Sequence, residues 1–198
     1  MDELRSGDAL IIVDVQNDFL PGGALGVAAG DAILEPLNRC IDAFERRGLP
    51  IVATRDWHPP NHCSFQARGG PWPPHCVAGT PGAEFALGLS LPCAARIVSK
   101  ATRSDEEAYS AFQGTGLGVQ LKDLGCTRVF IGGLATDYCV RATALDARAA
   151  GFDVVVLEDA VRSVDVDAGD GRRALEEISA HGVRLCSTIA AIGLTELG

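Results

Sequence analysis

The chain alternates between short apolar runs rich in Val and Ile and stretches with helical spacing. This alternation constrains the fold more than any other feature. The runs lie at residues 9–15, 50–54, 96–99, 128–131, 153–157 and 183–187. Their apolar residues are continuous rather than alternating, which is typical of strands covered on both faces. The pattern predicts βαβ units. We therefore expect a three-layer α/β/α domain with a six-stranded, mainly parallel sheet.

Between the runs, apolar residues recur at helical steps. Ile33, Leu37, Ile41 and Phe44 form one such series, and Gly48 is a natural stop for it. Further helices are predicted over residues 119–124, 140–149 and 174–178. Residues 56–92 have no strong period and hold seven of the ten prolines. A loop of this length inside a compact domain indicates function.

Composition limits the class of protein. A chain of 198 residues fits one domain, which we expect to span residues 1–198. Its net charge of −9, without a basic run, argues against a nucleic-acid partner or an anionic membrane surface. We find no membrane-length apolar run and no signal peptide pattern. Seven cysteines without a Cys-x-x-Cys pair do not resemble a secreted disulfide framework. We expect a reduced, cytoplasmic protein.

Reactive side chains follow the predicted strands. Ligands of open parallel sheets bind at the carboxyl ends of the strands, where this chain places Asp14, Lys100 and Cys139. Cys139 opens a predicted helix, and the helix N-terminus and Lys100 would both favour its thiolate. Asp14, at the buried end of a central strand, suits a general base. The sequence therefore predicts a nucleophilic cysteine with a carboxylate and an amine on one edge of the sheet.

The irregular loop holds a second cluster. It contains Asp56, His58, His62 and His75, and its three histidines lie within 18 positions. Two histidines and one carboxylate form a common divalent-metal site that leaves positions open for water or substrate. The alternative is that these residues only cap turns of the loop. We favour the metal site.

Four stretches, at residues 14–19, 56–59, 72–77 and 133–140, resemble the nicotinamidase branch of the isochorismatase-like cysteine hydrolases. The resemblance covers about residues 8–188. It implies the catalytic triad Asp14, Lys100 and Cys139. It also implies a cis bond between Leu134 and Ala135, and an oxyanion hole from the backbone amides of Ala135 and Cys139.

The resemblance further implies how substrate and metal are held. The metal ligands would be Asp56, His58 and His75, with His62 a further ligand in some members. The aromatic residues that enclose the substrate ring would be Phe19, Trp72 and Tyr109. One divalent ion is implied. We expect zinc first, although iron or manganese would also suit these ligands.

The implied activity is hydrolysis of nicotinamide to nicotinic acid and ammonia through a thioester on Cys139. The acidic insert at residues 103–107 departs from the family pattern and would alter the approach to the pocket. A metal-free isochorismatase or N-carbamoyl amide hydrolase on the same fold is an alternative, as is a non-enzymatic thiol–metal sensor. A homo-oligomer is compatible with the sequence.

Overall fold

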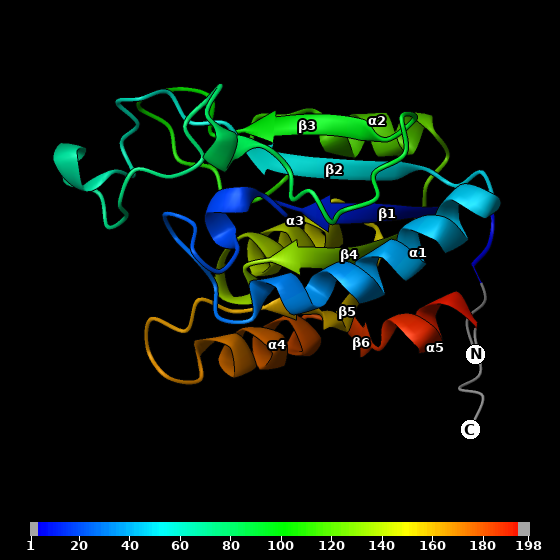
Figure 1. Cartoon of the computed structure of the whole chain (residues 1–198). Helices are drawn as coiled ribbons and strands as arrows, with labels where there is room; N and C mark the ends of the chain where they lie inside the picture. The colour runs from blue at the N-terminus through cyan, green and yellow to red at the C-terminus, as the bar shows by residue number, and fades with distance from the viewer. Residues whose placement is uncertain (1–3, 194–198) are drawn as a thin grey trace.

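The computed structural model describes residues 4–193 and contains a six-stranded sheet in the order β3-β2-β1-β4-β5-β6 (Figure 1). Every described strand pair is parallel. The strands are β1 (Asp8–Val13), β2 (Ile51–Asp56), β3 (Arg96–Lys100), β4 (Arg128–Leu134), β5 (Asp153–Arg162) and β6 (Arg184–Cys186). Residues 1–3 and 194–198, which the predicted single domain includes, lie outside the described residues.

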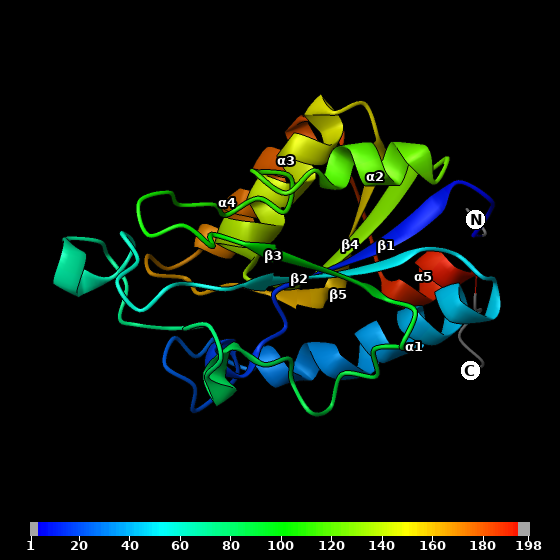
Figure 2. The ribbon, with the colours of Figure 1, turned by 90° about the horizontal axis from the view of Figure 1, so that it is seen from above.

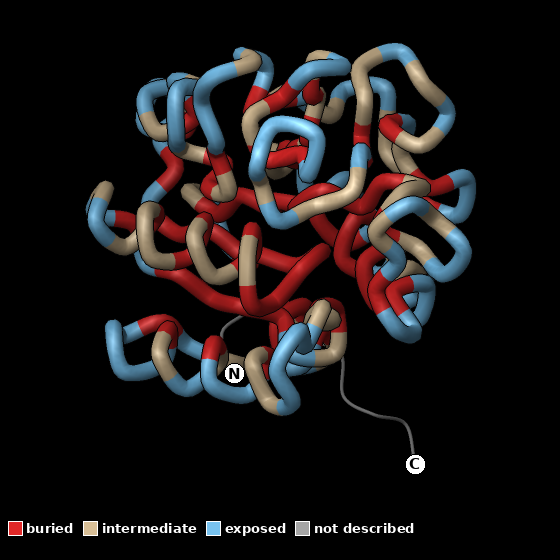
Figure 3. Tube along the Cα trace, turned by 90° about the vertical axis from the view of Figure 1, so that its left-hand side faces the viewer, coloured by how far each residue is buried: buried red, intermediate tan, exposed pale blue. Residues whose placement is uncertain are grey.

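Helices cover both faces of the sheet. One face is covered by α1 (Leu34–Arg46) and α5 (Thr188–Ile192), and the other by α2 (Leu117–Asp123), α3 (Arg141–Ala149) and α4 (Asp170–Ala180) (Figure 2). Short helical turns are η1 (Asn17–Phe19), η2 (Gly30–Ile33), η3 (Gln66–Arg68), η4 (Pro81–Ala83) and η5 (Thr136–Val140). A separate apolar cluster lies on each face, and the buried stretches concentrate in the sheet (Figure 3). The predicted three-layer architecture is confirmed.

Several boundaries differ from the predicted ones. β1 ends at Val13 because Asp14 has a φ of 49°, which takes the chain out of the extended conformation. β5 continues to Arg162, five residues beyond the predicted end at 157. The short helix α5 was not predicted, and it begins at a capping bond in which the Ser187 hydroxyl accepts from the Ala190 amide. Among the described residues, no helix has the length and apolar character needed to span a bilayer.

A buried ion pair fixes the amino ends of the two central strands. Arg128 at the start of β4 donates two hydrogen bonds of 2.7 Å to the carboxylate of Asp8 at the start of β1. Because both side chains are buried, this bidentate pair restrains the register between β1 and β4.

The strand order reverses beside β1. The chain passes from β1 to β2 and β3 on one side, then returns to place β4 on the other side of β1. The loops that follow β1 and β4 therefore run in opposite directions and leave a crevice at the carboxyl ends of these two strands. In Figure 1 the arrowheads point to this edge, where the long loop after β2 also lies.

Candidate active site

The ammonium group of Lys100 is the centre of the candidate site. Its Nζ lies 2.5 Å from Asp56 Oδ1, 2.9 Å from Asp14 Oδ2 and 3.4 Å from Cys139 Sγ. It also donates a 3.1 Å hydrogen bond to the carbonyl oxygen of Ala108. Strands β1, β2, β3 and the segment after β4 thus bring the three predicted catalytic side chains together with one predicted metal ligand.

Neighbouring strands fix Asp14 and Cys139. The Thr54 hydroxyl on β2 donates a 2.7 Å hydrogen bond to Asp14 Oδ1. Cys139 is the fourth residue of η5, a π-helical turn that leads directly into α3. One carboxylate oxygen from each of Asp14 and Asp56 lies within 4.8 Å of the Cys139 sulfur.

Two buried carboxylates share this single ammonium group. Burial raises the pKa of Asp14, although the Lys100 charge opposes the shift. Burial would also raise the pKa of Asp56, but Lys100 and His58 outweigh it and hold that pKa well below its usual range. Burial alone would lower the pKa of Lys100, yet the two carboxylates raise it well above its ordinary value. The triad therefore contains a permanent cation beside a carboxylate that gains a proton more readily than an exposed aspartate.

The buried environment of Cys139 opposes the thiolate that the helix terminus and Lys100 favour. Burial raises the pKa of Cys139 well above its ordinary value, and Lys100 only partly offsets this while Asp14 adds to it. Loss of solvation and two nearby carboxylates thus outweigh the helix terminus and the lysine. Burial and the carboxylates thus favour a neutral thiol beside Asp14, whereas Lys100 favours the thiolate, as the sequence indicated.

The three predicted metal ligands form one buried group. Ligand atoms of Asp56, His58 and His75 all lie within 4.8 Å of one another, and His58 Nε2 lies 3.7 Å from Asp56 Oδ2. His58 and His75 use Nδ1 for backbone carbonyls, at 3.3 Å from Ala101 and 2.8 Å from Pro73. Such contacts fix the ring and direct the other nitrogen toward a metal.

Two further observations fit a cation at this group. Within residues 4–193, His58 Nε2 is buried and has no hydrogen-bond partner, which is costly unless an ion binds there. Burial lowers the pKa of His75, which keeps its ring in the neutral form that binds metals. A second close group, formed by Asp14, Asp56 and Cys139, already surrounds the Lys100 ammonium. Asp56, His58 and His75 are therefore the group of the two that could hold a metal ion.

His62 lies beside this group without joining it. Its ring centroid is 4.2 Å from that of His58. Both its ring nitrogens are engaged, Nδ1 at 2.7 Å from the Ser64 hydroxyl and Nε2 at 3.0 Å from the Glu106 carbonyl oxygen. The insert at residues 103–107 thus contacts His62 through the Glu106 carbonyl oxygen. Because both ring nitrogens of His62 are engaged, neither is available to bind a metal in this arrangement.

A small aromatic pocket of about 30 Å³ opens onto Cys139. The three predicted ring-enclosing residues line it, namely Phe19, Trp72 and Tyr109. The Trp72 indole donates a 3.1 Å hydrogen bond to the Tyr109 hydroxyl. Ala135 also lines the pocket, and the peptide bond between Leu134 and Ala135 is cis, as the resemblance implied.

Three pocket residues were not predicted: Leu25, Tyr138 and Val164. The Tyr138 ring packs edge-on against Trp72 at a centroid distance of 5.0 Å. Its position next to Cys139 could have suggested it. Leu25 and Val164 come from segments without a motif, so only the folded chain brings them to the pocket.

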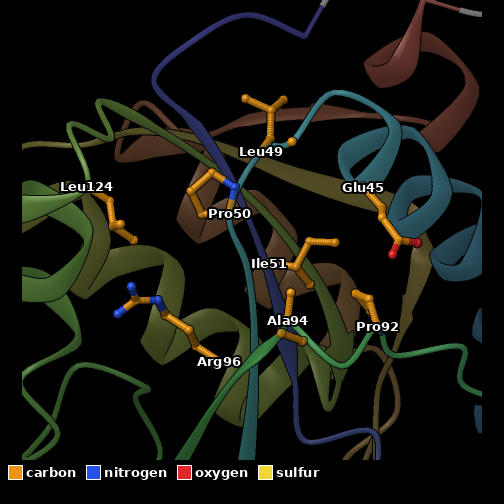
Figure 4. Close-up of a pocket in the computed structure, with 10 residues that line it drawn as sticks. Glu45, Leu49, Pro50, Ile51, Pro92, Ala94, Arg96 and Leu124 are labelled. Carbon is orange, nitrogen blue, oxygen red and sulfur yellow. The ribbon is translucent and has the colours of Figure 1, made fainter.

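A larger cavity lies elsewhere. It has a volume of about 270 Å³ and is lined mainly by apolar residues near the amino ends of β2 and β3, including Leu49, Pro50 and Ile51 (Figure 4). Glu45 and Arg96 are its charged lining residues. None of the predicted site residues, all of which the structure describes, lines this cavity.

Comparison with known families agrees with this geometry. The model of the isochorismatase domain matches residues 8–190, a span that includes every predicted site residue. The chain belongs to the isochorismatase family.

Two solved structures and one protein of known sequence are similar to this chain over most of its length. The chain is 54% identical to the pyrazinamidase of Pyrococcus horikoshii, solved in complex with zinc, over 91% of this chain and 99% of that one, with a TM-score of 0.88. It is 42% identical to a protein from L. infantum solved in complex with nicotinate, over 96% and 98% of the two chains, with a TM-score of 0.89. The nicotinamidase of Acinetobacter baylyi is 41% identical over 202 residues, covering 91% of this chain and 92% of that protein.

Proposed function

We propose that the chain is a metal-dependent amidohydrolase that converts nicotinamide to nicotinic acid and ammonia. The observation that carries this proposal is the placement of Cys139 Sγ 3.4 Å from Lys100 Nζ, which lies 2.9 Å from Asp14, at an aromatic pocket beside the metal group. The zinc-bound pyrazinamidase and the nicotinamidase among its relatives support the same substrate class.

The first half-reaction makes the thioester. Cys139 attacks the carboxamide carbon while the Asp14 carboxylate accepts the thiol proton, so that the C–S bond forms as the C=O electron pair moves to oxygen. The backbone amides of Ala135 and Cys139 stabilise the resulting oxyanion. When the tetrahedral intermediate collapses, the C–N bond breaks and Asp14 returns its proton to the departing amine. Ammonia leaves, and nicotinoyl thioester remains on Cys139.

The second half-reaction releases the acid. Water attacks the thioester carbon, and Asp14 accepts the proton of that water. The C–S bond then breaks, the thiol is restored and nicotinic acid is released. Lys100 keeps its charge throughout, because the carboxylates of Asp14 and Asp56 hold its pKa well above the ordinary value. Its ammonium therefore orients Asp14 and stabilises negative charge near the sulfur.

The metal group would act on the substrate ring. Asp56, His58 and His75 would hold a divalent ion, which would supply a Lewis acid for the pyridine nitrogen of the substrate. The buried, unpartnered His58 Nε2 in the described structure argues for this metal-dependent form over a metal-free isochorismatase or N-carbamoyl amide hydrolase. Zinc is the first choice and agrees with the zinc-bound relative, while iron and manganese suit the same ligand types.

Ammonia release tests the proposal. The purified protein should release ammonia from nicotinamide and also from pyrazinamide, which carries a pyrazine ring in place of pyridine. Chelator treatment should abolish this activity, and adding zinc should restore it. A protein that binds zinc but releases no ammonia would instead support the thiol–metal sensor, and chelator-resistant turnover would support the metal-free hydrolase.

A further inference from the structure

One wall of the substrate pocket comes from the segment that joins β5 to α4. Val164 in this segment lines the pocket together with Tyr138 and Cys139. The segment lies at the carboxyl edge of the sheet, next to the turn after β4 (Figure 1). Val164 therefore borders the space in which the substrate ring would lie.

A single buried carboxylate ties this segment to the nucleophile. Asp137 lies in η5, two residues before Cys139, and is 7% exposed. Its Oδ1 accepts a 3.0 Å hydrogen bond from the Val164 amide, and its Oδ2 accepts a 2.9 Å bond from the Asp165 amide. Each oxygen thus holds one backbone amide, and together they fix the segment against the turn that carries Cys139.

The segment is also anchored on its far side. Asp165, whose φ is 52°, accepts a 2.7 Å hydrogen bond through Oδ1 from the Gly171 amide in the first turn of α4. Its Oδ2 accepts a 2.9 Å bond from the Ser163 hydroxyl. The Ser163 side chain fills the space that a Cβ on residue 171 would need, which explains the glycine there. With α4 behind the segment, the Asp137 bonds decide how closely Val164 approaches the pocket.

We propose that Asp137 is a positioning residue which holds Val164 as the wall that limits substituents on the substrate ring. This inference rests on the proposed amide hydrolysis and extends it to substrate choice among aromatic carboxamides. A tight apolar wall discriminates by about 10–200-fold for each added methyl group. The pocket is small, at about 30 Å³, and Val164 is part of its lining.

The first test replaces the wall. Ammonia release gives kcat/KM for nicotinamide and for each of its ring-methylated isomers, with wild type, Val164→Ala and Val166→Ala. Val166 lies in the same segment but is 62% exposed, so it is the matched control. In Val164→Ala, at least one methyl isomer should gain about tenfold or more relative to nicotinamide. Val166→Ala should leave all the ratios unchanged. Unchanged ratios in Val164→Ala, with nicotinamide turnover retained, would overturn the inference.

The second test removes the hydrogen bonds that hold Val164 in place. Asp137→Ala removes both acceptor oxygens, whereas Asp137→Asn keeps one. We therefore expect the alanine variant to lose discrimination among the methyl isomers and the asparagine variant to lose less of it. Adding Val164→Ala to Asp137→Ala should give little further gain. Equal losses of kcat for every isomer in both variants would show a merely structural role and would overturn the inference. If wild type released no ammonia from nicotinamide, the proposed function itself would be refuted.

Discussion

Replacing Lys100 by Met should destabilise the protein in a pH-dependent way. Lys100 is fully buried and lies between two carboxylates, at 2.9 Å from Asp14 and 2.5 Å from Asp56. With an effective dielectric constant of about 20, Coulomb's law gives about 6 kcal/mol for the Lys100–Asp14 contact alone. The desolvation of Lys100 that the variant avoids offsets part of this. We expect a net loss of about 3–5 kcal/mol in unfolding free energy at pH 8, typical of breaking a buried ion pair.

The pH dependence has a definite sign. Burial and the Asp56 charge raise the pKa of Asp14, and Lys100 opposes them, so its removal should raise this pKa further. The folded variant then binds a proton that the unfolded chain, with a carboxyl pKa of about 3.9, releases. Because the folded variant binds this extra proton, its loss of stability relative to wild type should shrink as pH falls from about 8 to about 5. Burial lowers the pKa of both His62 and His75, which reduces the stability of variant and wild type alike over this range, so the comparison is made with wild type.

Urea denaturation in the presence of chelator, at both pH values, measures this effect. Lys122 is the only other lysine in the sequence, and it is exposed on α2, so Lys122→Met is the matched control. That control should stay within about 0.5 kcal/mol of wild type. Adding Asp14→Asn to Lys100→Met should recover part of the lost stability. If Lys100→Met were no less stable than Lys122→Met, or if its loss of stability relative to wild type grew on acidification, the ion-pair account of the site would be refuted.

Three further changes test other parts of the structure. His75→Ala should lose bound metal and raise KM for nicotinamide steeply, because it removes a ligand, and metal analysis showing full occupancy would contradict the assignment. Arg128→Met should lower the unfolding free energy by about 3–5 kcal/mol, because it leaves the buried Asp8 carboxylate without its cation. The amount of bound metal should not change. Calorimetry measures the first effect and metal analysis the second. Burial raises the pKa of the Cys139 thiol, so iodoacetamide should label exposed Cys93 before Cys139 at pH 7, with Cys139 labelling rising only at alkaline pH. Peptide mass spectrometry showing the reverse order would indicate a resting thiolate.

The sequence predicted the meeting of Asp14, Lys100 and Cys139 because the carboxyl ends of parallel strands lie on one edge of the sheet. Apolar runs identify parallel strands, and the residue that ends each strand must lie on one edge. The metal group was partly predictable for a similar reason, since Asp56 ends β2 and His58 follows it by two residues. The choice of His75 rather than His62 came from the family resemblance, because both histidines lie in the irregular loop.

Other features depend on the folded environment and left no local signal. The raised pKa of Cys139 arises from burial and from carboxylates on β1 and β2, which outweigh the helix terminus that the sequence does show. Val164 lines the pocket, and its amide is bonded to Asp137, which lies 27 positions away in the sequence. The engagement of both His62 nitrogens likewise depends on a backbone carbonyl 44 positions away.

Trapping of the covalent intermediate tests the central claim most directly. Wild-type protein mixed with nicotinamide and quenched in acid during turnover should show an added nicotinoyl group by intact mass, and peptide mapping should place it on Cys139. Cys139→Ala should show neither the adduct nor ammonia release. Turnover retained in Cys139→Ala, or an adduct on another residue, would contradict the mechanism.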